Sequence, residues 1–275
     1  MTIMCFDKTG TLTQNKMSLH VLGVLPEVEQ NASESFFNGG VIPMDGALAN
    51  SSLPSHAQEL LKYAVWASEV EPFDPMEKAF HDTFAQCIQS GLIHTGTHGD
   101  SHKVAPLEIV HEYSLTPEFP AVTHVWSTGN LPESRNASHF LVAIKGSPEL
   151  VMKLCPLSAD QASLIAEQMR VMAADGLRML GVAKAVFEKD PADPWPETPD
   201  GFEWQWLGLT GLKDPIRPEV PEAVRQCHQA GVRVVMITGD HALTAQAIAK
   251  QAGIPSKLVI TGAQIQSFSE AQLLD

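Results

Sequence analysis

Residues 7–13 have the sequence Asp-Lys-Thr-Gly-Thr-Leu-Thr, and they follow a short apolar run at residues 2–6. The apolar run predicts a strand, which places Asp7 at its carboxyl end, where ligands bind in open α/β sheets. A carboxylate in that position can attack phosphorus and form an aspartyl phosphate. The charge of Lys8, the hydroxyl of Thr9 and the backbone N–H groups of the turn are suited to hold the phosphate oxygens.

The last third of the chain alternates between helix and strand signals. Helical spacing predicts helices at residues 219–230 and 241–251, and β-branched residues between them predict a strand at residues 232–238. A further apolar run predicts the start of another strand at residues 258–260. This alternation is typical of an open, mostly parallel sheet.

Charge divides the chain into three parts. Residues 1–14 and 209–275 are each neutral, whereas residues 15–208 hold 11 basic and 25 acidic residues and therefore the whole net charge of −14. An acidic stretch between two neutral ends suggests a domain inserted into a loop of another domain. The acidic charge argues against non-specific binding to nucleic acid. The apolar runs are far shorter than the roughly 18 residues that span a bilayer.

The acidic part mixes helix and strand signals. Helical spacing predicts helices at residues 57–68, 75–89 and 158–175, and apolar runs predict strands at residues 140–144 and 177–185. A proline-rich stretch at residues 190–201 predicts a loop. An α+β arrangement follows from this mixture.

Potential metal ligands are scattered. None of the cysteines stands in a CxxC pair, so reduced thiols are expected at Cys5, Cys87, Cys155 and Cys227. His94, His98 and His102 stand four residues apart, as on a metal-binding helix face, but Gly96 and Gly99 disfavour a helix. A solvated loop is the favoured interpretation, and a metal site is the alternative.

The motif at residues 7–13 resembles the phosphorylation motif of P-type cation-transporting ATPases, nearest the calcium-pump-like bacterial members. Further segments resemble motifs of that family, in the family's order. They are Asp74-Pro75-Met76-Glu77, Glu112-Tyr113-Ser114, Lys145-Gly146-Ser147-Pro148-Glu149, Gly176-Leu177-Arg178, Asp214-Pro215-Ile216-Arg217 and Thr238-Gly239-Asp240.

The resemblance implies a fold of two domains. Residues 1–14 and 209–275 would form part of the phosphorylation domain, a haloacid-dehalogenase-like α/β domain with a parallel sheet. Residues 15–208 would form the inserted nucleotide-binding domain, an α+β domain of antiparallel sheet and helices. The division agrees with the one that charge suggests.

The resemblance also implies roles for single residues. Asp7 would be the nucleophile and, with Thr9, a ligand of Mg²⁺; the other catalytic positions would be Lys8, Thr238, Gly239 and Asp240. In the nucleotide site Glu77 would bind near adenine, the Tyr113 ring would stack on it, and Lys145 would line the pocket. The remaining nucleotide contacts would come from Gly146, Arg178, Asp214 and Arg217.

The implied function is the ATP-binding and phosphorylation portion of a cation pump. Its cofactors would be ATP and Mg²⁺, and its partners the transported cation and the membrane, through a longer integral membrane parent at whose cytoplasmic face it would lie. Later motifs of the family are missing from the sequence, so we expect this chain to bind ATP but to turn it over poorly by itself.

Two other functions stay open. One is a haloacid-dehalogenase-like phosphatase, although such enzymes usually carry a second Asp where this chain has Thr9. The other is a non-catalytic nucleotide-binding regulatory module.

Overall fold

The structure is a computed structural model, and it describes residues 2–26, 40–44, 53–93, 108–127, 138–190, 193–240, 242–256 and 258–269. His94, His98 and His102 lie outside the described residues. The chain forms two compact units. The first consists of Met1–Lys16, Arg170–Arg178 and Lys213–Asp275, and the second of Met17–Met169 and Met179–Leu212. The assignment of the units to phosphorylation and nucleotide binding stays a prediction.

The first unit is built on a parallel strand pair. Strand β1 (Ile3–Asp7) pairs with β9 (Arg233–Ile237), and their register runs from Ile3 opposite Arg233 to Asp7 opposite Ile237. The helices of this unit are α5 (Val220–Gln229), α6 (Ala242–Gln251) and α7 (Gly262–Ser267). The strands predicted at residues 2–6 and 232–238 and the helices predicted at residues 219–230 and 241–251 are confirmed as β1, β9, α5 and α6.

A small apolar core holds the first unit together. Its buried members come from the turn after β1, from α5, from β9 and from the end of α6: Leu12, Val220, Val224, Val234, Ala249, Ala252 and Ile254. The strand predicted at residues 258–260 is wrong. These residues are not in a strand, and Leu258 is exposed. An apolar run becomes a strand only where a neighbouring strand pairs with it, and nothing described pairs with this one.

The second unit is built on a sheet of seven strands, in the order β3-β2-β8-β7-β6-β5-β4. The strands are β2 (Ser18–Gly23), β3 (Val41–Pro43), β4 (Ile109–Tyr113), β5 (Ala121–Ser127), β6 (Ser138–Gly146), β7 (Arg178–Lys189) and β8 (Gln205–Lys213). The pairs β2–β3, β4–β5, β5–β6 and β6–β7 are antiparallel. The predicted combination of a parallel sheet with an antiparallel α+β part is confirmed.

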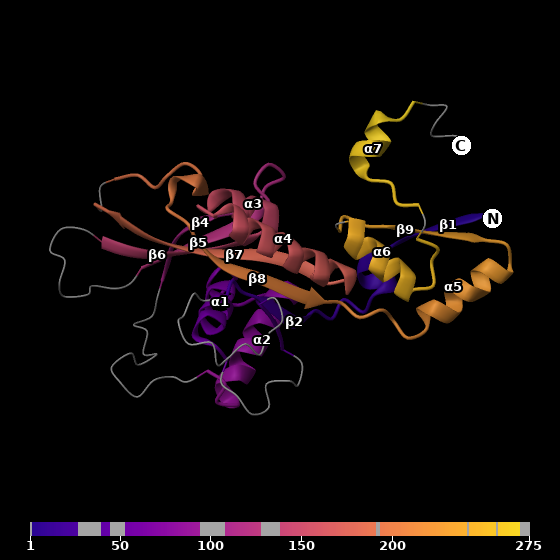
Figure 1. Cartoon of the computed structure of the whole chain (residues 1–275), viewed down its shortest axis with the longest axis horizontal. Coiled ribbons are helices and arrows are strands. Elements are labelled where there is room, and N and C mark those ends of the chain that lie inside the picture. Colours follow the sequence, from indigo (N-terminus) through magenta and orange to yellow (C-terminus); the bar gives the residue numbers. More distant parts are fainter. Residues whose placement is uncertain are drawn as a thin grey trace. The chain divides into compact units, whose positions relative to one another are not determined.

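Helices cover the two faces of this sheet. Helices α1 (Ser55–Trp66) and α2 (Pro75–Gln89) lie on one face, and α3 (Pro148–Leu154) and α4 (Ala159–Ala174) lie on the other (Figure 1). Helix α2 begins as the sequence predicts, because the Asp74 carboxylate accepts a hydrogen bond from the Met76 N–H at 2.8 Å and Pro75 fits the first turn. No helix in the described parts of the chain has the length and apolar character needed to cross a bilayer.

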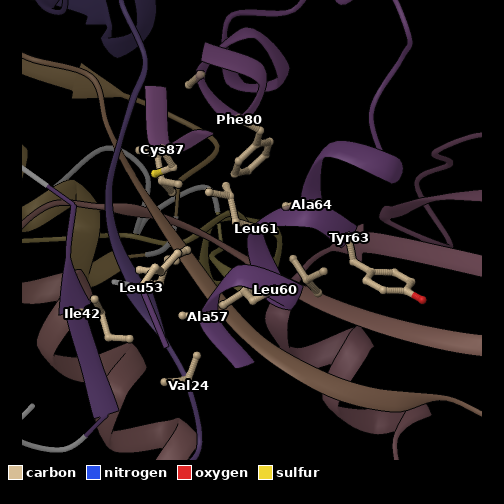
Figure 2. Close-up of a cluster of buried hydrophobic side chains, with 14 of the residues drawn as sticks. Val24, Ile42, Leu53, Ala57, Leu60, Leu61, Tyr63, Ala64, Phe80 and Cys87 are labelled. Atoms are coloured by element: carbon tan, nitrogen blue, oxygen red, sulfur yellow. The ribbon is translucent and has the colours of Figure 1, made fainter. Parts of the chain in front are cut away.

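The main core of the second unit lies between α1, α2 and the sheet. Figure 2 shows Leu60 and Leu61 of α1, Phe80 of α2 and Ile42 of β3 in this cluster, and all four side chains are fully buried. Burying each such side chain stabilises the fold by roughly 1.5–3 kcal/mol. The core therefore holds the end of α1 and the start of α2 firmly against the sheet.

The cysteines are free thiols that differ in exposure: Cys5 is exposed, Cys227 is half-buried, and Cys87 and Cys155 are buried. Burial raises the pKa of the Cys155 thiol to about 12 and raises that of Cys87 as well. Because the thiolate is the reactive form, we expect a maleimide reagent at neutral pH to modify Cys5 first and Cys227 second. Cys87 and Cys155 should react only in denaturant. Mass spectrometry of peptides measures the order, and early modification of Cys155 would contradict the packing described.

Candidate functional site

The candidate phosphorylation site lies at the carboxyl edge of the parallel pair in the first unit. Asp7 is the last residue of β1 and is opposite Ile237, the last residue of β9. Because the strands run parallel, Asp7 and the Thr238-Gly239-Asp240 turn leave the sheet at the same edge. The Asp7 side chain is exposed there. The structure thus brings together two motifs that are separated by more than 200 residues in the sequence.

An ion pair joins the two motifs directly. The Nζ of Lys8 lies 2.6 Å from the Oδ2 of Asp240, and the two side chains are 4% and 10% exposed. A buried ammonium is stable only with a partner, and Asp240 supplies it. The N–H of Asp240 also donates to the hydroxyl of Thr238 at 3.1 Å, which closes the turn around Gly239. Lys8 therefore positions Asp240 beside the edge from which Asp7 projects.

The backbone turns sharply between Lys8 and Leu12, the irregular turn η1. Gly10 has φ +76°, a left-handed conformation that glycine adopts without strain. The Gly10 N–H donates to the hydroxyl of Thr13 at 3.2 Å. Thr9, a predicted ligand of phosphate and Mg²⁺, is exposed on this turn.

Asp214 and Arg217 hold this turn in place. The fully buried hydroxyl of Thr13 donates to Asp214 Oδ2 at 2.5 Å, and the N–H of Lys16 donates to Asp214 Oδ1 at 3.2 Å. The Arg217 guanidinium donates to the Gly10 carbonyl at 2.9 Å. Both residues are predicted to contact the nucleotide, and their role in holding this turn is not predicted from the sequence. This role follows from the burial of Asp214, because a carboxylate that is 6% exposed requires donors, and burial is visible only in the structure.

In the second unit, two predicted nucleotide residues form a buried pair. The Nζ of Lys145, on β6, lies 2.7 Å from the Oε1 of Glu77, in the first turn of α2, and their side chains are 6% and 12% exposed. Lys145 also donates to the Ala67 carbonyl, and Glu77 Oε2 accepts the Glu69 N–H at 3.3 Å. Burial lowers the pKa of Lys145, and the charge of Glu77 opposes that shift. The end of α1 and the start of α2 thus hold one buried cation against the sheet.

Gly146 has a packing reason to be glycine. A Cβ added there would lie 2.5 Å from the Cα of Ala121 and from the Pro120 carbonyl, which no side chain tolerates. The close approach of β6 to the start of β5 follows from this glycine. Arg178 is another residue predicted to contact the nucleotide, and it is exposed at the start of β7.

The structure does not place Tyr113 together with Lys145. Tyr113 is opposite Thr123, and Thr123 is opposite Ile144, so Tyr113 lies on the other face of the sheet from Lys145. Its hydroxyl donates to the Pro196 carbonyl at 2.7 Å, and its ring packs edge-on against Phe202. Tyr113 is thus part of an aromatic cluster on the other face, and its contact with adenine stays a prediction.

Two other aromatic side chains, Trp66 and Trp126, lie on the face that carries Lys145, and the sequence motifs do not point to them. Trp126 donates its indole N–H to the Trp66 carbonyl at 2.9 Å, and the two rings lie 6.3 Å apart. Residues 122, 124 and 126 of β5 share the face of Lys145, and this placement follows from the strand register, which the sequence by itself does not show.

Comparisons with known proteins identify the family of the chain. A family model described as haloacid dehalogenase-like hydrolase matches residues 1–267. Among curated proteins, the chain is 30% identical to "Sodium/potassium exporting P-type ATPase cta3" of Schizosaccharomyces pombe, over 99% of this chain and 29% of that protein. It is 30% identical to "Calcium-transporting ATPase PAT1" of Dictyostelium discoideum, over 99% of this chain and 24% of that protein.

A third relative is bacterial. The chain is 29% identical to "Cation-transporting ATPase pma1" of Synechocystis, over 99% of this chain and 31% of that protein. The chain thus spans less than a third of the length of these three relatives. The predicted resemblance to P-type cation-transporting ATPases is confirmed. Because the family model matches nearly the whole sequence, the chain belongs to the haloacid dehalogenase-like hydrolases.

Proposed function

We propose that the chain is the ATP-binding and phosphorylation portion of a cation-transporting P-type ATPase, in which ATP phosphorylates Asp7. The observation that carries the proposal is the Lys8–Asp240 ion pair, because it joins the two motifs at the edge where Asp7 is exposed. The transported cation would be bound by other segments of a longer protein, with this portion at the cytoplasmic face of its membrane.

The residues of the first unit have the chemistry that Mg²⁺ requires. Mg²⁺ prefers oxygen ligands, and the exposed turn offers the Asp7 carboxylate and the Thr9 carbonyl. The ion would offset the negative charge of an incoming phosphoryl group. Asp240, held by Lys8, and the hydroxyl of Thr238 would line the phosphate.

The second unit would bind the nucleotide at the Lys145–Glu77 pair. Lys145 offers an aliphatic stem and a cation on the sheet face, while Glu77 offers a hydrogen-bond acceptor. Arg178, Asp214 and Arg217 complete the predicted set of nucleotide residues. Because Asp214 and Arg217 also hold the phosphorylation turn, we assign them first to positioning Asp7.

Calorimetric titration with ATP tests the nucleotide site, with GTP and AMP as comparison ligands. We expect saturable ATP binding that weakens about 10-fold or more in Lys145→Ala, since hydrogen bonds to charged groups contribute about 1.5–3 kcal/mol. Lys153→Ala is the matched control, because Lys153 is exposed on α3. Circular dichroism checks that each variant is folded, and Glu77→Gln gives a second, isosteric change.

Two results would contradict the proposed site. One is the absence of ATP binding at millimolar nucleotide, which would favour a regulatory module without a working pocket. The other is equal affinity in the Lys145→Ala and Lys153→Ala variants, which would place the nucleotide elsewhere.

A further inference from the structure

Three potential metal ligands meet on the face of the sheet that carries Lys145. They are Glu69, which follows α1, Glu112 on β4 and His124 on β5. Glu112 and His124 are directly opposite each other in the strand register. One ligand atom from each of the three residues lies within 4.8 Å of the others. Neither the proposed phosphorylation chemistry nor the proposed nucleotide site uses any of these side chains.

The burial and hydrogen bonding of His124 indicate a side chain that coordinates a metal ion rather than one that only packs in the core. The side chain is fully buried, and its Nδ1 lies 3.1 Å from the Trp66 carbonyl. A carbonyl oxygen can only accept, so Nδ1 carries the proton and Nε2 presents a lone pair. That Nε2 is buried and has no hydrogen-bond partner among the described residues. Leaving such an atom without a partner costs about 1–3 kcal/mol, and a bound metal ion would remove that cost.

The charges around His124 suit a cation. The carboxylates of Glu69 and Glu112 are exposed and can supply two negative charges. Burial, followed by the charge of Lys145, lowers the pKa of His124, and the charges of Glu112 and Glu69 oppose that shift. Burial thus favours the neutral imidazole, which is the form that binds a metal ion. The hydrogen bond from Nδ1 to a backbone carbonyl is the usual means of orienting a ligating histidine.

We propose that His124 Nε2, Glu69 and Glu112 bind one divalent transition-metal ion of the Zn²⁺ class, with water completing the coordination. In a tetrahedral Zn²⁺ site with bonds of about 2.0–2.2 Å, ligand atoms stand about 3.4 Å apart. The two glutamates are exposed, so the proposal requires rotation of their side chains, which would break the hydrogen bond from the Ser114 hydroxyl to Glu112 Oε1. An imidazole ligand favours Zn²⁺ and its neighbours over Mg²⁺ or Ca²⁺, which select oxygen ligands.

A metal ion bound at this site would stiffen the neighbouring Lys145–Glu77 ion pair. The N–H of Glu69 donates to Glu77 Oε2 at 3.3 Å, so a metal held by the Glu69 side chain anchors the segment that supports Glu77. The ion would also join the end of α1 to β4 and β5. A ligand that binds only the folded state raises the melting temperature, which gives the site a readout that is independent of nucleotide.

The experiment uses the 275-residue chain carrying His94→Asn, His98→Asn and His102→Asn, which removes the histidine-rich segment as a competing ligand. After treatment with a chelator, the protein is titrated with ZnCl₂ by calorimetry and melted with and without the metal. We expect one Zn²⁺ per chain and a higher melting temperature. Glu69→Gln and Glu112→Gln should each weaken binding 10-fold or more, and Co²⁺ should give a visible absorption band that Glu112→Gln removes.

Glu118→Gln is the matched control, because Glu118 is an exposed acid of the same β4–β5 connection outside the cluster. It should leave Zn²⁺ affinity unchanged, and excess MgCl₂ should not displace the ion. These variants change only exposed side chains, so the test does not depend on the folding of a His124 variant. Absence of one-to-one Zn²⁺ binding would overturn the proposal, and so would an affinity that Glu69→Gln and Glu112→Gln leave unchanged.

Discussion

The Lys145→Met substitution is expected to lower the free energy of unfolding by about 3 kcal/mol, because removing one partner of a buried ion pair leaves the other charge uncompensated. The Glu77 carboxylate, 12% exposed, would keep only the weak hydrogen bond from the Glu69 N–H. Glu77→Gln should be destabilising as well. In the double variant the second substitution should cost much less than it does alone, as it does for residues that interact directly. Urea denaturation of the four proteins measures these differences.

The chain contains a matched control for this cycle. Lys184 on β7 pairs with Glu59 of α1 in the same unit, but these side chains are 21% and 39% exposed. Exposed pairs contribute about 0–1 kcal/mol, so Lys184→Met should change stability far less than Lys145→Met. Equal losses in the two variants would show that the Lys145–Glu77 pair is no more buried in solution than a surface pair.

Asp7→Asn is expected to remove all covalent phosphate from the chain. After incubation with ATP and Mg²⁺, the unmodified protein should carry a small amount of phosphate that hydroxylamine releases, as an acyl phosphate does, because the chain is expected to turn ATP over poorly by itself. The variant should carry none. An amide cannot take the place of the attacking carboxylate oxygen. Phosphate quantification after acid quench, followed by peptide mapping, measures both the amount and the position. Even a weak label decides the question, because it should map to Asp7 in the unmodified protein and be absent from the variant.

Asp82→Asn serves as the control, because Asp82 is an exposed carboxylate of α2 in the second unit. It should keep the label. The lifetime of the label separates a pump segment from a phosphatase. With Thr9 in the place of a second Asp, no carboxylate activates water there, so the phosphate should persist. A label that remains on the Asp7→Asn variant would contradict the proposed function. A phosphate that is hydrolysed from Asp7 as fast as it is transferred there would contradict it as well.

Local sequence determined the elements whose signals are complete within a few residues. Helix α2 was predicted with its observed bounds, because Asp74 caps it, Pro75 fits its first turn and its apolar positions follow helical spacing. The strand that ends at Asp7 and the turn at Gly10 were likewise readable, since the motif itself requires them. Residues 258–260 show the limit of local signals. They are apolar enough for a strand but do not form one, because a strand also needs a pairing partner that can be distant in the sequence.

Which side chains share a site was decided only by the tertiary structure. The predicted motif residues proved to include true pairs, Lys8 with Asp240 and Lys145 with Glu77, whose members come from distant segments. The face on which Tyr113 lies depended on strand register, and a shift of one residue would have reversed it. The meeting of Glu69, Glu112 and His124 depended on the same register. Residue type and local motif determine the chemistry that a side chain offers. Packing and strand register determine the partner that it meets.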